Sequence, residues 1–393
     1  MDKIEELLTR GVEEVIDKEH LLKLLKSKKK LRVKLGIDPT SPNIHIGRAV
    51  VLWKLRAFQE LGHKVIFIVG DSTGLIGDTS DKDSERPRMS EAEIKKNIKT
   101  YFAQAYKILD KKNSETHYNS KWLKKLGFKE MGELADLFGL HEFEARENIA
   151  RRLKDGKRVS VRELLYPLMQ GYDSVAVKAD VELGGTDQKF NLLAGRKIQK
   201  AYGQSQQDIL ITTLMEGTDG RKMSSSWGNV INITDEPNEM FGKVMSISDD
   251  LIKKYFVLAT NLLLDEIERV VEANLNPRDQ KAILAQTIVG LYHGENTGTR
   301  ARQNFKVKYS PSPSPSPEPE MEVDYELNKS VGNYPIVDLL VEGKLASSKS
   351  EARRKVREGA VEVDGVRIGD EKASVDIVKG TLIRLGKRFL RIK

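Results

Sequence analysis

Residues 31–70 read LRVKLGIDPTSPNIHIGRAVVLWKLRAFQELGHKVIFIVG. The two ends of this stretch, 31–37 and 64–70, are short, apolar and rich in β-branched residues, as buried strands are. The segment from Ile46 to Leu61 between them is long enough for a helix and apolar on most sides, which predicts a buried helix. A strand, a crossover helix and a second strand form a βαβ unit, so we expect a parallel sheet.

The chain beyond this unit predicts more sheet and then helix. Apolar runs at 180–185 and 209–214 continue the strand pattern, whereas residues 90–155 are charged and helical in pattern, as an inserted or covering layer would be. We therefore expect an α/β fold with a doubly wound, Rossmann-like parallel sheet. Such a sheet binds ligands at the carboxyl ends of its strands, so the motifs that follow Ile37 and Gly70 fall where a site is expected.

The carboxyl-terminal third of the chain predicts separate domains. Residues 236–304 are helical in pattern, and SPSPSPSPEPE at 310–320 predicts an extended linker, with an ordered loop as the alternative. The segment EARRKVREGAVEVDGVRI at 351–368 predicts a basic helix, a strand, a turn at Asp364-Gly365 and a strand. We expect a catalytic domain over 1–228 with a helical insertion at about 95–155, an α-helical domain over 229–308, a linker over 309–328 and a small α+β domain over 329–393.

Composition limits the function classes. The chain of 393 residues has no cysteine, which excludes disulfides, thiolate metal sites and cysteine nucleophiles. No apolar run approaches the roughly 20 residues of a transmembrane helix, and the first residues lack a signal-peptide pattern, so we expect a cytoplasmic protein with no membrane partner. The net charge is +8, and residues 331–393 carry 14 Lys and Arg against 9 Asp and Glu. This surplus favours a polyanionic partner, although a solvated basic surface remains the alternative.

The strongest local motif is DPTSPNIHIGR, from Asp38 to Arg48. It leaves the first strand and enters the helix, whose amino end offers N–H groups and a positive dipole to a phosphate. Thr40 adds a hydroxyl, His45 a ring N–H, and Gly47 lets a nucleotide approach the backbone closely. A histidine alone would as readily cap the helix or fill the core, but the whole string predicts nucleotide binding.

A second motif is GRKMSSSWGN at 220–229. Glycines flank a lysine and three serines, so the segment predicts a polar loop that closes over phosphates. By itself such a loop is as often plain surface.

Together the two motifs resemble the HIGH and KMSKS signatures of class I aminoacyl-tRNA synthetases, in the same order. The segments between them resemble the tyrosyl branch of that family, and the tail resembles the small ribosomal-protein-like RNA-binding domain of many bacterial tyrosyl enzymes. The intervening segments are GLIGDTSDKDSER at 74–86, Tyr166 and Gln170 in a Tyr-x-x-x-Gln pattern, Tyr172-Asp173, and ELGGTDQKFN at 182–191.

The resemblance implies that tyrosine is activated with ATP and then transferred to tRNA(Tyr). The amino-acid carboxylate attacks the α-phosphate, so no catalytic base is needed and catalysis consists of positioning and charge stabilisation. Mg²⁺ accompanies ATP and bridges its phosphates, without a metal site built by the protein. The positions that the resemblance assigns to the phosphates are Thr40, His45, Arg48, Lys82, Arg86, Lys222 and Ser225.

The same resemblance assigns the amino-acid and nucleoside contacts. Asp78, Tyr166 and Gln170 hold the α-amine, Asp173 accepts a hydrogen bond from the phenol, and Gln188 lies at the carboxylate. Because an unpartnered buried carboxylate is costly, Asp173 would disfavour phenylalanine. The ATP-binding positions are Gly36, Asp38, Gly47, Gly185, Asp187 and Met223, with Gly185 and Asp187 at the ribose hydroxyls.

Three residues depart from the family pattern. Arg48 replaces the second histidine of the first signature, and Ser225 replaces the second lysine of the second signature, which removes a cation from the phosphates. Lys34 stands where the best-known branch has a tyrosine that contacts the phenol; it could donate a hydrogen bond there or point away.

The resemblance also implies macromolecular partners. The helical region 236–304 and the basic tail would hold tRNA through phosphate contacts, with Arg353, Arg354, Lys355 and Arg357 as candidates. An exposed amphipathic helix is the alternative for this basic run. The insertion at 95–155 would form a homodimer interface.

Three other functions compete with this interpretation. A tryptophanyl-tRNA synthetase shares the class signatures but normally lacks the Tyr-Asp pair, the GGTDQ string and the tail. A non-catalytic RNA-binding relative would suit the altered Arg48 and Ser225. A small nucleotidylyltransferase uses a His-x-Gly-His turn but has no need of this tail.

Overall fold

The computed structural model describes residues 2–80, 84, 89–273, 275–309, 325–386 and 388–393. The chain divides into two compact units, Met1–Thr299 and Arg300–Lys393. The predicted Ser/Pro linker at 310–320 lies outside the described residues, as do Lys82 and Arg86 of the predicted site. Among the helices that are described, none is long and apolar enough to cross a membrane.

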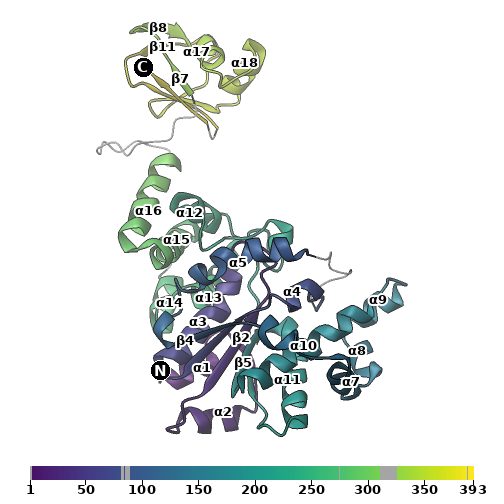
Figure 1. Cartoon of the computed structure of the whole chain (residues 1–393). Helices are drawn as coiled ribbons and strands as arrows, with labels where there is room; N and C mark the ends of the chain where they lie inside the picture. The colour runs from purple at the N-terminus through teal and green to yellow at the C-terminus, as the bar shows by residue number, and fades with distance from the viewer. Residues whose placement is uncertain (1, 81–83, 85–88, 274, 310–324, 387) are drawn as a thin grey trace. The chain divides into compact units, whose positions relative to one another are not determined.

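The first unit is built around a six-stranded sheet in the order β1-β6-β5-β2-β3-β4 (Figure 1). The five strands from β6 to β4 are parallel, and β1 pairs antiparallel to β6 at one edge. The strands are β1 (Val12–Ile16), β2 (Arg32–Ile37), β3 (Lys64–Val69), β4 (Ser114–Tyr118), β5 (Val181–Gly185) and β6 (Asp208–Thr212). The predicted parallel sheet and βαβ unit are confirmed.

The strand order reverses between β2 and β5. From β2 the chain crosses through α3 (Ile46–Glu60) to β3 and on to β4, and then returns to the other side of β2 for β5 and β6. Connections that leave β2 and β5 therefore diverge at their carboxyl ends, which opens a crevice at this switch point.

Apolar residues buried on both faces account for the parallel strands. Val33, Leu35 and the run from Val65 to Val69 are at most 3% exposed, which is the pattern of a sheet covered by helices on both faces. The helix α3 begins at Ile46, and the side chain of the N-cap residue His45 accepts a hydrogen bond from the Arg48 amide. The sequence thus directs the chain out of β2, through the first motif and into α3.

Two strands were not predicted. β4 lies inside the segment 90–155, which was expected to be helical, and its sequence Ser-Glu-Thr-His-Tyr contains no aliphatic residue. It occupies the edge of the sheet, where half-exposed polar residues are accepted. β1 lies in an amino-terminal segment that shows only a charged amphipathic pattern. The prediction that residues 90–155 are helical in pattern is therefore wrong at 114–118.

Helices cover the sheet, and α10 packs against α11 beside the crevice. Pro167 lies in the second turn of α10. The helices of this part are α1 (Lys3–Thr9), α2 (Lys18–Leu25), α4 (Thr73–Ile76), α5 (Glu91–Ala105), α6 (Ser120–Leu123), α7 (Phe128–Asp136), α8 (Leu140–Glu144), α9 (Glu147–Lys154), α10 (Val161–Val177) and α11 (Lys189–Ala201).

The predicted helical region after residue 236 is also present. Its helices are α12 (Pro237–Met245), α13 (Ile252–Ala259), α14 (Leu264–Glu272), α15 (Pro277–His293) and α16 (Glu295–Tyr309). α15 packs against both α12 and α13.

The second unit has its own core of aliphatic side chains from Ile336 to Ile392. One sheet has the order β10-β9-β12-β13-β7 and a second pairs β11 with β8. Asp364 and Gly365 both adopt positive φ between β9 and β10, which confirms the predicted hairpin turn. The elements are β7 (Tyr325–Leu327), β8 (Gly332–Pro335), α17 (Ile336–Glu342), α18 (Lys349–Arg357), β9 (Val361–Val363), β10 (Val366–Ile368), β11 (Ser374–Ile377), β12 (Leu382–Leu385) and β13 (Arg388–Ile392).

Candidate active site

A cavity of about 800 Å³ opens at the switch point of the sheet. It is lined by Gly36 and Ile37 at the end of β2, by Gly184 and Gly185 at the end of β5, and by Thr212 at the end of β6. A cavity of this volume holds a ligand the size of a nucleotide.

Both sequence motifs and the segments between them reach this one cavity. The predicted site residues that line it are Gly36, Asp38, Thr40, His45, Gly47, Arg48, Asp78, Tyr166, Gln170, Gly185, Asp187, Gln188, Lys222, Met223 and Ser225. Asp173 is not among the lining residues, and Lys82 and Arg86 lie outside the described residues.

The two motifs touch through a sulfur atom. The amide of Gly47 lies 3.4 Å from Sδ of Met223, and a Cβ at position 47 would lie 3.3 Å from that sulfur and 3.1 Å from Nδ1 of His45. A β-carbon at position 47 would therefore make tight contacts with both side chains. Burial, followed by the charges of Arg48 and Lys222, lowers the pKa of His45 to about 3. The ring is therefore neutral and acts as a hydrogen-bonding group.

Asp38 holds the start of the first motif in place. Its carboxylate accepts hydrogen bonds from the hydroxyls of Thr73, at 2.7 Å, and Tyr166, at 3.0 Å. Gly70 allows this arrangement, because a Cβ there would lie 2.1 Å from Oδ1 of Asp38 and 2.2 Å from Oγ1 of Thr73. Burial and the nearby Asp38 raise the pKa of Tyr166 well above its ordinary value, so its hydroxyl remains a donor.

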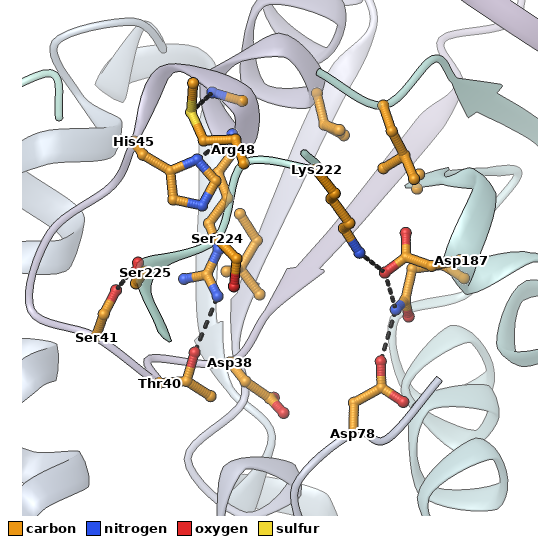
Figure 2. A pocket seen from close by; sticks show the side chains of 18 of the residues that line it. Asp38, Thr40, Ser41, His45, Arg48, Asp78, Asp187, Lys222, Ser224 and Ser225 are labelled. Carbon is orange, nitrogen blue, oxygen red and sulfur yellow. Dashed lines mark hydrogen bonds and ion pairs between the residues drawn. The ribbon is translucent and has the colours of Figure 1, made fainter. Parts of the chain in front are cut away.

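A chain of polar contacts runs along one wall of the cavity (Figure 2). Nζ of Lys222 lies 3.2 Å from Oδ2 of Asp187, and Nε2 of Gln188 lies 3.3 Å from the same oxygen. Gln188 also donates to Oδ2 of Asp78 at 2.6 Å. The only described lysine of this cavity is thus connected to the carboxylate predicted for the amino-acid amine.

Asp173 lies one turn of α10 beyond Gln170 but is only 3% exposed. Its carboxylate accepts hydrogen bonds from Nε1 of Trp122, at 2.7 Å, and from Nδ2 of Asn119, at 3.2 Å. Burial raises the pKa of Asp173 to about 7 against the opposing charge of Lys34. This carboxylate is therefore buried and does not line the cavity, and each of its oxygens accepts one hydrogen bond.

Lys34 is fully buried and does not line the cavity. Its ammonium lies 2.8 Å from Glu182, and both side chains are at most 1% exposed. It also donates to the carbonyl of Gln170 and to Oγ of Ser174, while Gln170 donates from its amide to Glu182 at 3.2 Å. The buried pair thus attaches the cavity-lining turn of α10 to strands β2 and β5. The contacts of Lys34 in the structure are thus with Glu182 and α10.

Hydrogen bonds within residues 219–229 hold the loop that contains the KMSSS segment. Asn229 accepts from the Ser224 amide at 2.8 Å and donates to Asp219 at 2.7 Å. Oγ of Ser225 lies 3.3 Å from Oγ of Ser41, which joins the loop to the first motif. Five residues of the two motif strings line the cavity although the sequence did not single them out: Ser41, Pro42, Ser224, Ser226 and Trp227.

The predicted tRNA contacts lie on α18 of the second unit. Arg353, Arg354 and Arg357 are exposed and Lys355 is half-buried. Glu358 pairs with Lys355 at 2.8 Å and with Arg354 at 3.7 Å. Neighbouring acids therefore offset part of the charge of this helix.

Comparison with known proteins agrees with this geometry. Residues 26–309 match the family described as "tRNA synthetases class I (W and Y)", and residues 322–389 match the "Tyrosine--tRNA ligase SYY-like C-terminal domain". The second match favours the tyrosyl over the tryptophanyl branch.

Curated relatives match over nearly the whole chain. The tyrosine–tRNA ligase of Thermotoga maritima is 46% identical over 98% of this chain and 96% of its own length, and that of Moorella thermoacetica is 44% identical over 98% and 94%.

Solved structures show the same fold. One is a truncated mitochondrial tyrosyl-tRNA synthetase from Coccidioides posadasii (TM-score 0.64, 23% identity). The match covers 77% of this chain and 92% of that protein's chain. The Archaeoglobus fulgidus tyrosyl-tRNA synthetase, solved with L-tyrosine (TM-score 0.61, 23% identity), covers 77% and 100%. With two family matches and relatives of this identity along its length, the chain belongs to the class I tyrosyl-tRNA synthetases.

Proposed function

We propose that this chain is a tyrosine–tRNA ligase, which forms tyrosyl-adenylate from tyrosine and ATP and transfers the tyrosine to the 3′ end of tRNA(Tyr). One observation carries the proposal: Asp78 and Lys222, predicted for opposite ends of the reactants, line the same cavity and are connected through Asp187 and Gln188. An amino acid and a nucleotide that bind there would lie side by side.

The first half-reaction joins an oxygen of the tyrosine carboxylate to the α-phosphorus of ATP. The bond from that phosphorus to the bridging oxygen breaks, and pyrophosphate leaves with the electron pair. The carboxylate is already ionised, so the protein's task is to align it and to stabilise the charge that develops on the phosphates. Thr40, neutral His45 and Lys222 would do this, together with Lys82 and Arg86.

The amino-acid end is recognised by the polar wall of the cavity. Asp78, Tyr166 and Gln170 would hold the ammonium group, in which the Asp78 contact is a charge-assisted hydrogen bond. Gln188 would meet the carboxylate, and Gly185 and Asp187 the ribose hydroxyls. Asp173 retains one unused lone pair on each oxygen, with which it would accept the phenolic hydroxyl at the floor of the cavity.

Magnesium enters as part of the substrate, MgATP. The group of described His and acidic residues that could hold an ion is Asp17, His20 and Asp208, and none of the three lines the cavity. The ion would bridge phosphate oxygens and offset their charge, as Mg²⁺ does in sites without a dedicated protein cage.

An ATP–pyrophosphate exchange assay with each of the twenty amino acids tests the activation step. We expect exchange with tyrosine and at least about 10³-fold less with phenylalanine, because phenylalanine would leave Asp173 without its phenol partner. Exchange that depends on tryptophan alone would replace this function with its tryptophanyl counterpart. No exchange with any amino acid would favour a non-catalytic relative.

Transfer to tRNA would use the basic face of α18. In the full-length protein, Arg353→Glu with Arg354→Glu should raise the KM for tRNA about tenfold or more, because phosphate contacts dominate such affinity. Tyrosine-dependent exchange should stay within twofold. A matched control is Lys189→Glu, at an exposed position of the first unit. Unchanged charging by the double variant would contradict a role for α18.

The proposed protein is a cytoplasmic homodimer whose subunits meet through the inserted helices. Phe128 is 97% exposed and Leu140 is 61% exposed on α7 and α8, which leaves apolar surface of the kind that subunit interfaces cover. Sedimentation of Phe128→Asp together with Leu140→Asp should show a monomer if these side chains lie in the interface.

A further inference from the structure

Arg48 projects from the first turn of α3 into the cavity (Figure 2). Its Nη2 donates to Oγ1 of Thr40 at 2.9 Å and its Nη1 donates to the hydroxyl of Tyr101 at 2.7 Å. Burial raises the pKa of Tyr101, so this hydroxyl stays neutral. The guanidinium is therefore held in a fixed position by two neutral oxygens.

No carboxylate of the described chain lies at ion-pair distance from Arg48. Asp38 accepts hydrogen bonds from Thr73 and Tyr166 instead. Lys222 differs in this respect, because its ammonium lies 3.2 Å from Asp187. A permanently charged, half-buried guanidinium with N–H donors to spare matches the geometry and charge of a phosphate.

His45 cannot supply positive charge on this side of the cavity. Its pKa of about 3 keeps the ring neutral, and the charge of Arg48 is one of the causes. In Figure 2 Lys222 lies beside Asp187, apart from Arg48 and Thr40. Of the described lining residues near Thr40, Arg48 is thus the cation.

Ser225 lies in the same neighbourhood. Its hydroxyl is 3.3 Å from that of Ser41, the residue next to Thr40, and it lines the cavity as an exposed, uncharged residue. The KMSKS signature has a lysine at this position. Ser225, at the position of the absent lysine, therefore lies close to Thr40, whose hydroxyl accepts a hydrogen bond from Arg48.

We propose that Arg48 supplies a cation to the pyrophosphate of ATP, in place of the lysine that Ser225 replaces. This inference rests on the proposed activation of tyrosine. When the bond between the α-phosphorus and the bridging oxygen breaks, negative charge grows on the departing pyrophosphate, and the guanidinium stabilises it through two N–H donors. Because Thr40 accepts its hydrogen bond from Arg48, its own O–H is left to donate to a phosphate oxygen.

A four-protein comparison tests the compensation: the wild type, Arg48→His, Ser225→Lys and the double variant. Arg48→His should lower kcat for tyrosine-dependent exchange about 10²-fold while the KM for tyrosine stays within threefold. Ser225→Lys should raise the rate at least tenfold more in the Arg48→His background than in the wild-type background. Equal factors in both backgrounds, or a rate for Arg48→His within twofold of the wild type, would overturn the proposal.

A positional role for Arg48 has a different signature. Tyr101→Phe removes one of its two hydrogen bonds but leaves its charge, so it should reduce kcat less than Arg48→His does. Arg48→Lys should likewise retain more activity than Arg48→His. If Tyr101→Phe and Arg48→His reduce the rate equally, with equal thermal unfolding temperatures, Arg48 acts through packing and the proposal fails.

Binding measurements separate this inference from the proposed function. Calorimetric titration with MgATP and with inorganic pyrophosphate measures how much Arg48 contributes to the affinity for phosphates, and it requires no reaction of an amino acid. Weaker pyrophosphate binding by Arg48→His than by the wild type would support the inference even if tyrosine produced no exchange. Equal pyrophosphate affinity of the two proteins would overturn it, whichever amino acid is activated.

Discussion

The two sides of the cavity differ in whether their charged side chains contact groups of opposite charge. On one side Lys222, Asp187, Gln188 and Asp78 contact one another in a continuous chain, so each charge has a partner before any ligand binds. On the other side Arg48 has, among the described residues, the hydroxyls of Thr40 and Tyr101 as its partners. A paired wall suits recognition of an amino acid by shape and hydrogen bonds, whereas an unpaired cation suits a ligand that brings its own negative charge.

The largest expected effect concerns the support of the paired side. Lys34→Met should lower the free energy of unfolding by about 3–5 kcal/mol, because it leaves Glu182 buried without its counterion. Adding Glu182→Leu should recover part of the loss. The matched control is Lys189→Met, which removes an exposed partner of Glu14 and should cost less than about 1 kcal/mol. Urea denaturation measures the free energy of unfolding of the wild type and of these three variants. Equal losses for the buried and the exposed lysine would contradict this account.

Next in size is the loss of the carboxylate at the end of the chain of contacts. Asp78→Ala should reduce kcat/KM for tyrosine about 10²- to 10³-fold, because a charge-assisted contact to the ammonium disappears. MgATP affinity should change less than threefold. Asp17→Ala, outside the cavity, is the control. A parallel loss of ATP affinity would mean that the two sides do not divide the substrates as described.

A further prediction tests Asp173 by pH. Its folded-state pKa of about 7 exceeds the ordinary 3.8, so between these values the folded protein binds more protons than the unfolded one. Stability from this group is complete below pH 3.8 and is lost as pH rises through 7, by at most about 1.4 kcal/mol per pH unit. Asp173→Asn should therefore gain stability relative to the wild type between pH 5 and pH 8.

The same titration should appear in substrate binding. An ionised Asp173 accepts the phenolic hydrogen bond better than a protonated one, although Glu182 and Lys34 also act on its charge. The KM for tyrosine should fall a few-fold between pH 6 and pH 8 in the wild type, and this dependence should be absent from Asp173→Asn. A pH-independent KM in the wild type would remove Asp173 from the phenol contact.

The local hydrophobic pattern of the sequence predicted the strands whose ends form the cavity. Apolar runs identified β2, β3, β5 and β6 because these strands are buried on both faces. β4 was missed because an edge strand of polar residues carries no such signal. Strand order predicted that the motifs after β2 and β3 reach one edge of the sheet, since carboxyl ends of parallel strands meet there. The resemblance to the synthetase family, rather than strand order, assigned Asp78 and Lys222 to the same site.

Contacts between distant residues could not be predicted in this way. Nothing local to Arg48 indicates that Tyr101, on α5 and 53 residues later, accepts a hydrogen bond from it. Likewise, Trp122 and Asn119 hold Asp173 from a segment that the sequence described only as a helical layer. These partners depend on how α5, α6 and α10 pack, which is a property of the whole fold.

Gly70 limits which amino-acid substitutions this protein can accept around the site. With less than 2.5 Å available for a β-carbon next to Asp38 and Thr73, even an alanine codon at position 70 would push apart the hydrogen bonds that orient Tyr166. In a library of randomised variants, positions 38, 70 and 73 would accordingly tolerate replacement only in combination. The residue that follows β3 therefore restricts which side chains can orient Tyr166 on α10.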